Sequence, residues 1–246
     1  MLKFTIILSV FILLVIGVVY FVFRSPFFQT TGIETTGSQR TEEIKGELIG
    51  FLLKTSNFRF WLGQENLLFW SPQNQKTPPS LFWLSNLNWT RDWRQKKITI
   101  DVKERRPWLL WCLQNTIDRC YWLDEEGIVF SLASKAEGFI IPKVFEENGR
   151  QQLIFGQPFY DNPQLVKNTL EIVKQIKNSS LVVNRFLVND FNLQEMETET
   201  NGLKLYFSLR YLPQNLNKIL TDLVSRLDFP KLKYVDFRVE NRIYYK

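Results

Sequence analysis

Two cysteines have a spacing that could support covalent chemistry in this chain of 246 residues. The segments 108–113 and 119–123 alternate as two β-strands, and a turn centred on Thr116 would place Cys112 directly opposite Cys120. Directly opposed residues of neighbouring strands lie about 4.5–5.5 Å apart, which is within reach of a disulfide. The alternative is two free thiols in the core, because buried cysteine behaves as a small apolar residue. The sequence leaves both alternatives open.

The acidic turn at 124–127 is the candidate for acid–base chemistry. Glycoside hydrolysis needs two carboxylates at a set separation, and Asp124, Glu125 and Glu126 supply three. Adjacent acids beside a glycine, however, are more often a solvated turn. The chain has no histidine, so it lacks the usual general base at neutral pH and the commonest zinc ligand. We therefore predict no catalytic, cofactor or metal site, and a protein that is not an enzyme.

Aromatic and basic residues interleave between Trp89 and Lys97, within the wider stretch 89–108. In a cytosolic protein this pattern would suggest single-stranded nucleic acid. In a chain with a net charge of +6 and a long apolar N-terminal segment, it fits a surface that faces a membrane or a partner better, because tryptophan favours the lipid headgroup region. The alternative is core tryptophan beside a solvated basic turn. We predict no nucleic-acid partner and no small-molecule substrate.

The elements that hold these residues begin with an uncharged run from Phe4 to Phe23. A helix of this length is roughly 30 Å long, the thickness of the hydrocarbon core of a bilayer. We predict a retained transmembrane helix, because no small-residue cleavage pattern follows it; the alternative is a cleaved signal peptide. Residues 1–3 would form a cytoplasmic tail. The rest of the chain would be extracytoplasmic, on a single-pass anchor in the cell membrane.

Residues 25–103 are predicted to form a first small domain. A hydrophobic content of 45% with 23% charged residues allows the chain to bury a core. Thr41 is the expected N-cap of a helix, in which Ile44 and Leu48 follow at helical spacing. The other expected elements are a strand at 33–37, a short helix at 65–70, and strands at 87–91 and 98–102 joined by a basic turn. This β-α-α-β-β order predicts helices packed on a short sheet.

Residues 104–246 are predicted to form a second domain, a mixed β domain with two flanking helices. Asn201-Gly202 favours a type I′ hairpin. The expected elements after the cysteine hairpin are a strand that starts at 128–130, a helix at 163–177, a strand at 186–189, strands at 195–200 and 203–209, a helix at about 213–227 that Pro230 ends, and a last strand at 233–239. The predicted fold class of the whole chain is therefore α+β.

The last predicted strand alternates in polarity. Val235, Phe237 and Val239 take every second position, as in an antiparallel strand with one buried face. Taken alone, the sequence fits a plain terminal strand whose edge is protected by the charges of Glu240 and Arg242.

Several short motifs resemble the FtsQ/DivIB family of bacterial cell-division proteins. The stretch 102–107 is similar to that family's V-x-E-R-x-P, the stretch 121–130 resembles its segment around L-V-D-x-x-G-x-V-F, and the stretch 234–238 looks like its Y-V-D-L-R. The chain also resembles the opening of the family's POTRA (polypeptide-transport-associated) domain, at Phe27-Phe28, Ile33, Gly37 and Thr41-Glu42-Glu43-Ile44. The order of these motifs behind a single N-terminal span strengthens the resemblance.

This resemblance implies a membrane-anchored, non-enzymatic scaffold of the divisome, acting in septation. The first domain would be a POTRA recruitment module, and the partners would be FtsB/DivIC-like and FtsL-like membrane proteins besides the lipid bilayer. The last strand would be an edge that accepts a segment of another division protein by strand addition. The partner-binding residues implied are Tyr234, Asp236, Arg238, Val239, Glu240 and Arg242.

The chain also departs from the family's pattern. The segment 56–79 is unusually aromatic, the expected cytoplasmic tail is very short, and the cysteine pair is not a family hallmark. An alternative is another membrane-anchored POTRA protein that acts in secretion or envelope assembly. A third class, an enzyme that acts on the cell wall, has no supporting motif.

Overall fold

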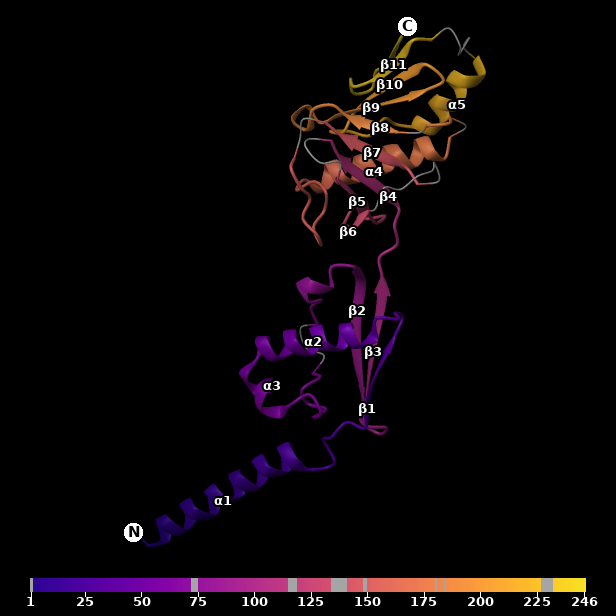
Figure 1. The fold of residues 1–246 in the computed structure, drawn as a ribbon. Helices are drawn as coiled ribbons and strands as arrows, with labels where there is room; N and C mark the ends of the chain where they lie inside the picture. Colours follow the sequence, from indigo (N-terminus) through magenta and orange to yellow (C-terminus); the bar gives the residue numbers. More distant parts are fainter. Residues whose placement is uncertain are drawn as a thin grey trace. The chain divides into compact units, whose positions relative to one another are not determined.

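The structure is a computed structural model that describes residues 2–71, 75–114, 119–133, 141–147, 150–179, 181–183, 185–226 and 232–246 (Figure 1). The chain divides into two compact units, Met1–Glu104 and Arg105–Lys246. Each unit combines helices with a sheet, so the fold is α+β, as predicted.

The first unit begins with helix α1 (Leu2–Arg24). Its segment Ile6–Arg24 has a mean hydropathy of 3.1, and none of that segment is buried in the protein. By length and composition this helix can cross a membrane. A helix of this kind near the N-terminus is consistent with a single membrane anchor or with a signal sequence.

The rest of the first unit packs two helices against a three-stranded sheet. The strand order is β1 (Gly32–Thr36), β3 (Lys97–Glu104) and β2 (Leu84–Asp92), with β1 parallel and β2 antiparallel to β3. Helix α2 (Thr41–Thr55) runs across this sheet (Figure 1). The apolar stripe that it buries consists of Ile44, Leu48 and Leu52, which confirms the helical spacing seen in the sequence.

Two local predictions in this unit are wrong. Helix α2 starts at Thr41, so Arg40 takes the N-cap position, where its guanidinium bonds the Glu43 carboxylate at 2.7 Å through two nitrogens. The second helix is α3 (Asn57–Leu62), and residues 65–70 are not helical. Their backbone instead pairs with the stretch 28–30, through Thr30 N to Glu65 O and Leu67 N to Phe28 O, both at 2.7 Å. A long-range contact thus overrides the local helical pattern.

The second unit contains a mixed sheet, nine-stranded over the residues that the structure describes. Its order is β12-β11-β10-β9-β8-β7-β4-β5-β6, with parallel pairs at β4/β7, β7/β8 and β10/β11. The strands are β4 (Leu109–Leu113), β5 (Arg119–Leu123), β6 (Val129–Ala133), β7 (Lys143–Glu146), β8 (Phe186–Val188), β9 (Glu195–Thr200), β10 (Leu203–Ser208), β11 (Tyr234–Phe237) and β12 (Tyr244–Tyr245). Short 3-10 turns lie at Pro79–Leu81 in the first unit and at Phe191–Leu193 in the second.

Helices α4 (Pro163–Lys177) and α5 (Leu216–Arg226) cover this sheet and share one apolar core with it (Figure 1). Helix α4 has the predicted bounds, since Pro163 occupies its first turn and the Asn162 side chain accepts from Gln164 N at 2.9 Å. Helix α5 begins later than predicted, because Asn215 takes a positive φ of 55° just before it. The predicted end of α5 at Pro230 lies outside the described residues.

The predicted hairpin between β9 and β10 is present. Asn201 and Gly202 have φ angles of 49° and 82°, as a type I′ turn requires at both central positions. The side chains of Met196 on β9 and of Leu205 and Phe207 on β10 are buried, so one face of this strand pair lies in the core.

Candidate partner-binding site

Strand β11 carries two of the residues implied in partner binding, Tyr234 and Asp236, but it does not lie at the edge of the sheet. It pairs with β10 on one side and with β12 on the other, where Val235 faces Tyr245 and Asp236 faces Tyr244. From the sequence we predicted that 233–239 is the last strand of the domain, with no further strand after it. The structure instead ends β11 at Phe237, reverses the chain and adds β12, which is the outermost strand of the described sheet.

The chain reversal explains where the remaining implied residues lie. Arg242 N donates to Val239 O at 3.1 Å, and Asn241 takes a positive φ of 59° within this turn. Val239 is therefore a turn residue and is 45% exposed, whereas the alternation predicted a strand residue facing the core. Glu240 and Arg242 are exposed in the same turn.

The hydrogen-bond pattern shows which main-chain groups of β12 face outward. Tyr234 and Lys246 exchange two bonds, N to O at 3.3 and 3.2 Å, so they form a hydrogen-bonded pair. In an antiparallel ladder such pairs alternate with pairs that exchange none. Tyr245, one residue before Lys246, therefore directs its N–H and C=O away from β11, toward the open side of the sheet. These groups can bond an added strand.

Exposed apolar and aromatic side chains gather along this edge. Ile243 is 38% exposed, Tyr244 46% and Tyr245 57%, and Val239 lies in the adjoining turn. We call these four residues the C-terminal edge. An aromatic and aliphatic surface beside unpaired main-chain groups is the usual composition of a peptide-docking site.

A hollow of about 240 Å³ adjoins the C-terminal edge. Its lining includes Phe237, Ile219 and Ile243. Tyr211 Oη closes one side by donating to Phe237 O at 3.1 Å, and burial raises the pKa of this hydroxyl. The hollow can take an apolar side chain from a strand that adds at the edge.

Asp236 and Arg238 bond each other. The guanidinium of Arg238 bonds the Asp236 carboxylate at 3.0 and 2.7 Å, its third nitrogen reaches Glu195 at 3.0 Å, and the group lies 4.9 Å from the centre of the Tyr206 ring. These bonds from Arg238 hold the pKa of Asp236 below its usual range and that of Arg238 above it. Arg238 thus connects the end of β11 to Glu195 on β9, and Asp236 positions the Arg238 guanidinium.

Two further implied residues also make contacts within the unit. The Tyr234 ring packs edge-on against Tyr206 with centroids 6.3 Å apart. A hydrogen bond with Tyr244 raises the pKa of Arg242, so Arg242 helps to orient one of the exposed rings of β12.

The cysteine hairpin has the predicted register, with Cys112 opposite Cys120, Trp111 opposite Tyr121 and Leu109 opposite Leu123. The two sulfur atoms are bonded to each other, so of the two alternatives left open by the sequence the structure has the disulfide. The predicted turn centre at Thr116 lies outside the described residues.

The acidic turn at 124–127 is held together by hydrogen bonds to Asp124. Asp124 is buried, and one of its oxygens accepts from Glu126 N at 3.0 Å and Ile128 N at 2.9 Å. Its other oxygen accepts from Arg105. Arg105 belongs to the V-x-E-R-x-P stretch, so two motifs named in the sequence meet here. Over the described residues no group of three or more histidine, cysteine or acidic side chains is placed to hold a metal ion.

Four of the eight tryptophans are buried in the cores of the two units. Trp70, Trp89 and Trp111 are almost completely buried, and Trp83 is 8% exposed. Trp93 is 40% exposed in the basic turn between β2 and β3, and Trp61 is 73% exposed on α3. The core alternative is therefore confirmed for Trp89, and a surface that faces a membrane or a partner stays a prediction for Trp93.

Sequence reasoning missed a buried ion pair and strand β12. Glu146 is fully buried and accepts from Trp111 Nε1 and Arg150 Nη2, both at 2.7 Å. The spacing of Glu146 and Arg150 is typical of a helix, yet both lie outside helices, so no local pattern pointed to the pair. The aromatic pair Tyr244-Tyr245 after a polar turn was the available signal for β12.

A scan of the chain against models of known protein families finds no match, and a search of curated proteins finds none either.

Proposed function

We propose that this protein is a membrane-anchored, non-enzymatic scaffold of FtsQ/DivIB type that binds other division proteins at its C-terminal edge. The observation that carries the proposal is the open side of β12, where outward main-chain groups of Tyr245 lie among exposed Val239, Ile243 and Tyr244. Strand addition supplies affinity through main-chain bonds and specificity through side-chain pockets. The hollow lined by Phe237 and Ile243 supplies such a pocket.

The proposal assigns the first unit to anchoring and recruitment. Helix α1 would stay in the cell membrane as a single span with a cytoplasmic N-terminus, and the body that follows would be extracytoplasmic. The β-α-α-β-β order of the first unit supports its role as a POTRA-type module. The disulfide supports an extracytoplasmic site, because such bonds persist in oxidising compartments.

The partners in this proposal are FtsB/DivIC-like and FtsL-like membrane proteins, each of which would contribute an extended segment. Strand β12 is only two residues long. A short edge strand protects the free protein against self-association while leaving main-chain groups for a partner.

The variant Tyr245→Pro tests the docking mode. Proline removes the outward N–H of residue 245 and leaves intact the inward bonds of Lys246 to β11. We expect co-purification of the full chain with the FtsB/DivIC-like protein of its own organism to be lost in Tyr245→Pro. The matched control, Tyr245→Phe, keeps the main chain and the ring and should retain the partner. Equal recovery with both variants would refute strand addition at this edge.

Localisation tests the biological role. A fluorescent fusion to the N-terminus of the full chain should concentrate at the division septum. An even distribution around the cell envelope would instead favour the alternative, a POTRA protein of secretion or envelope assembly.

A further inference from the structure

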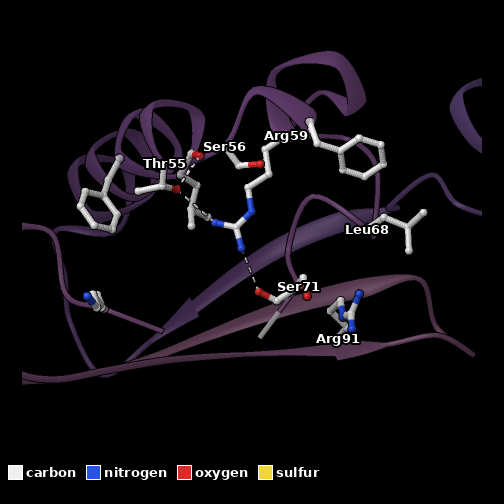
Figure 2. A pocket seen from close by; sticks show the side chains of 10 residues that line it. Thr55, Ser56, Arg59, Leu68, Ser71 and Arg91 are labelled. Carbon is white, nitrogen blue, oxygen red and sulfur yellow. Dashed lines mark hydrogen bonds between the residues drawn. The ribbon is translucent and has the colours of Figure 1, made fainter. Parts of the chain in front are cut away.

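A basic hollow lies in the first unit between the C-terminal end of α2, helix α3, the stretch 68–71 and strand β2 (Figure 2). It has a volume of about 810 Å³. Three of its lining side chains are cations, Arg59, Lys76 and Arg91, and none of its lining residues is acidic. Figure 2 shows the Arg59 guanidinium extending across the hollow from α3 toward Ser71.

The two arginines of the hollow have weak partners. Arg59 donates to Thr55 Oγ1 at 3.4 Å and to Ser71 O at 3.3 Å, and Arg91 donates to Leu67 O at 3.4 Å and lies 5.1 Å from the centre of the Trp93 ring. Over the part of the chain that the structure describes, neither arginine pairs with a carboxylate. Burial lowers the pKa of both groups, because partial removal from water disfavours an uncompensated positive charge. An anion in the hollow would supply the missing negative charge.

One wall of the hollow is attached to the end of α1. Arg91 donates to Leu67 O, and Leu67 N in turn donates to Phe28 O at 2.7 Å. The preceding residue, Asn66, donates through its side chain to Val22 O in the last turns of α1 at 2.9 Å. If α1 crosses a membrane, this chain of bonds keeps the hollow close to the lipid headgroups.

Helix α3, which contributes to the hollow, carries three exposed aromatic side chains, of which Phe58 lines the hollow. Phe58, which lines it, is 59% exposed, and Phe60 and Trp61 are 68% and 73% exposed. Three exposed aromatic side chains on one short helix form an apolar surface that water solvates poorly. Tryptophan and phenylalanine of this kind are stable in the interfacial region of a bilayer.

We propose that the hollow binds the phosphate group of an anionic phospholipid headgroup, with Arg59 and Arg91 bonding the phosphate oxygens and the aromatic side chains of α3 lying among neighbouring lipids. Guanidinium groups form strong charge-assisted bonds to phosphate oxygens. Lys76, exposed at the rim, adds a third positive charge. The inference rests on the anchoring part of the proposed function and is independent of the partner-binding edge.

Native mass spectrometry of the full chain in detergent tests this site, with phosphatidylglycerol, phosphatidylcholine and inorganic phosphate as separate probes. We expect one phosphatidylglycerol to be retained in preference to phosphatidylcholine, and inorganic phosphate at the same concentration not to displace it. Binding of inorganic phosphate without retention of phosphatidylglycerol would show a site for free phosphate and overturn the lipid assignment. Equal retention of the two lipids would also overturn it.

Variants of the lining cations test whether phosphatidylglycerol binds in the hollow. Arg59→Gln with Arg91→Gln should weaken phosphatidylglycerol retention roughly tenfold or more, because two charge-assisted bonds are lost. The control Lys103→Gln with Lys204→Gln removes the same charge at exposed strand positions that do not line the hollow and should bind as the wild type does. Lys76→Gln, a change at an exposed side chain, should weaken retention by a smaller factor even if the double arginine variant folds poorly. Unchanged binding in Lys76→Gln and in the arginine variant would refute the site.

The lipid-binding test and the partner-capture test of the proposed function can fail independently of each other. Loss of lipid retention in the arginine variant should leave partner capture through the C-terminal edge unchanged. Failure of partner capture in the wild type would leave the lipid measurement intact, because it needs only the full chain and lipid.

Discussion

Gly127 shows at the scale of a single residue how the D-x-x-G stretch fits this fold. Its φ is +78°, and a Cβ added there would lie 2.8 Å from ring and methyl carbons of Phe159 and Val166. The residue must therefore be glycine both for backbone conformation and for space. The sequence indicated a turn here, but the approach of Phe159 and Val166 depends on tertiary packing, which no local pattern reveals.

The variant Gly127→Ala should destabilise the second unit by roughly 2–4 kcal/mol, from backbone strain together with overpacking. Urea denaturation of the full chain, followed by tryptophan fluorescence, measures this loss. Gly202→Ala is the matched control, since Gly202 has a similar φ of +82° but nothing within 4 Å of its added Cβ. A loss for Gly127→Ala no larger than that of the control would contradict the packing argument.

The buried pair of Glu146 and Arg150 also acts at the residue scale. The Glu146 side chain is fully buried and depends on Arg150 and the Trp111 indole for its hydrogen bonds. Arg150→Met should cost roughly 3–5 kcal/mol of folding free energy, because it leaves a buried carboxylate uncompensated. Adding Glu146→Gln should recover part of that loss in a denaturation series. If the double variant were less stable than Arg150→Met alone, the buried-charge explanation would fail.

At the scale of elements, agreement between sequence and structure depended on how local the signal was. The register of β4 with β5 and the bounds of α4 were predicted correctly, because strand alternation and the Pro163 start are encoded within a few residues. The stretch 65–70 was wrongly predicted to be helical, because its backbone pairs with the distant stretch 28–30. Strand β12 was missed for the same reason, since two residues become a strand only beside β11.

The disulfide between β4 and β5 belongs to this scale. Reduction should lower the unfolding free energy by roughly 2–3 kcal/mol on the chain-entropy estimate, because a short loop is released. Intact mass spectrometry of the protein isolated without reductant should show a gain of two hydrogens on reduction. Absence of that gain would mean that the thiols are free in the isolated protein.

At the scale of the whole molecule, the candidate site was only partly foreseen. The motif at 234–238 pointed to the region that contains β11, and Val235 and Phe237 are buried as the alternation required. The outermost strand, the outward groups of Tyr245 and the adjoining hollow follow from pairing and packing across the second unit, so local alternation could not reveal them. The apolar N-terminal helix was the clearest whole-molecule signal, because a run of twenty uncharged residues needs no tertiary information.

Retention of α1 is a prediction for the whole chain. A tag fused before Met1 should be recovered at full length in the membrane fraction and should resist extraction with alkaline carbonate, as expected for a transmembrane helix. The variant Leu13→Arg with Val15→Arg, placed at the middle of α1, should release much of the protein, because charges at the bilayer centre are costly. Recovery of a shortened soluble chain without its tag would instead identify a cleaved signal.

The connection between β10 and β11 determines when during synthesis the proposed docking surface can form. These strands are parallel and adjacent, and α5 lies between them in the sequence, so β11 can pair with β10 only after α5 has been synthesised. The proposed docking surface is thus among the last parts of the described chain to leave the ribosome. A polypeptide whose synthesis stopped before β11 would display no such surface, and a partner that engages it would bind only chains that extend past β11.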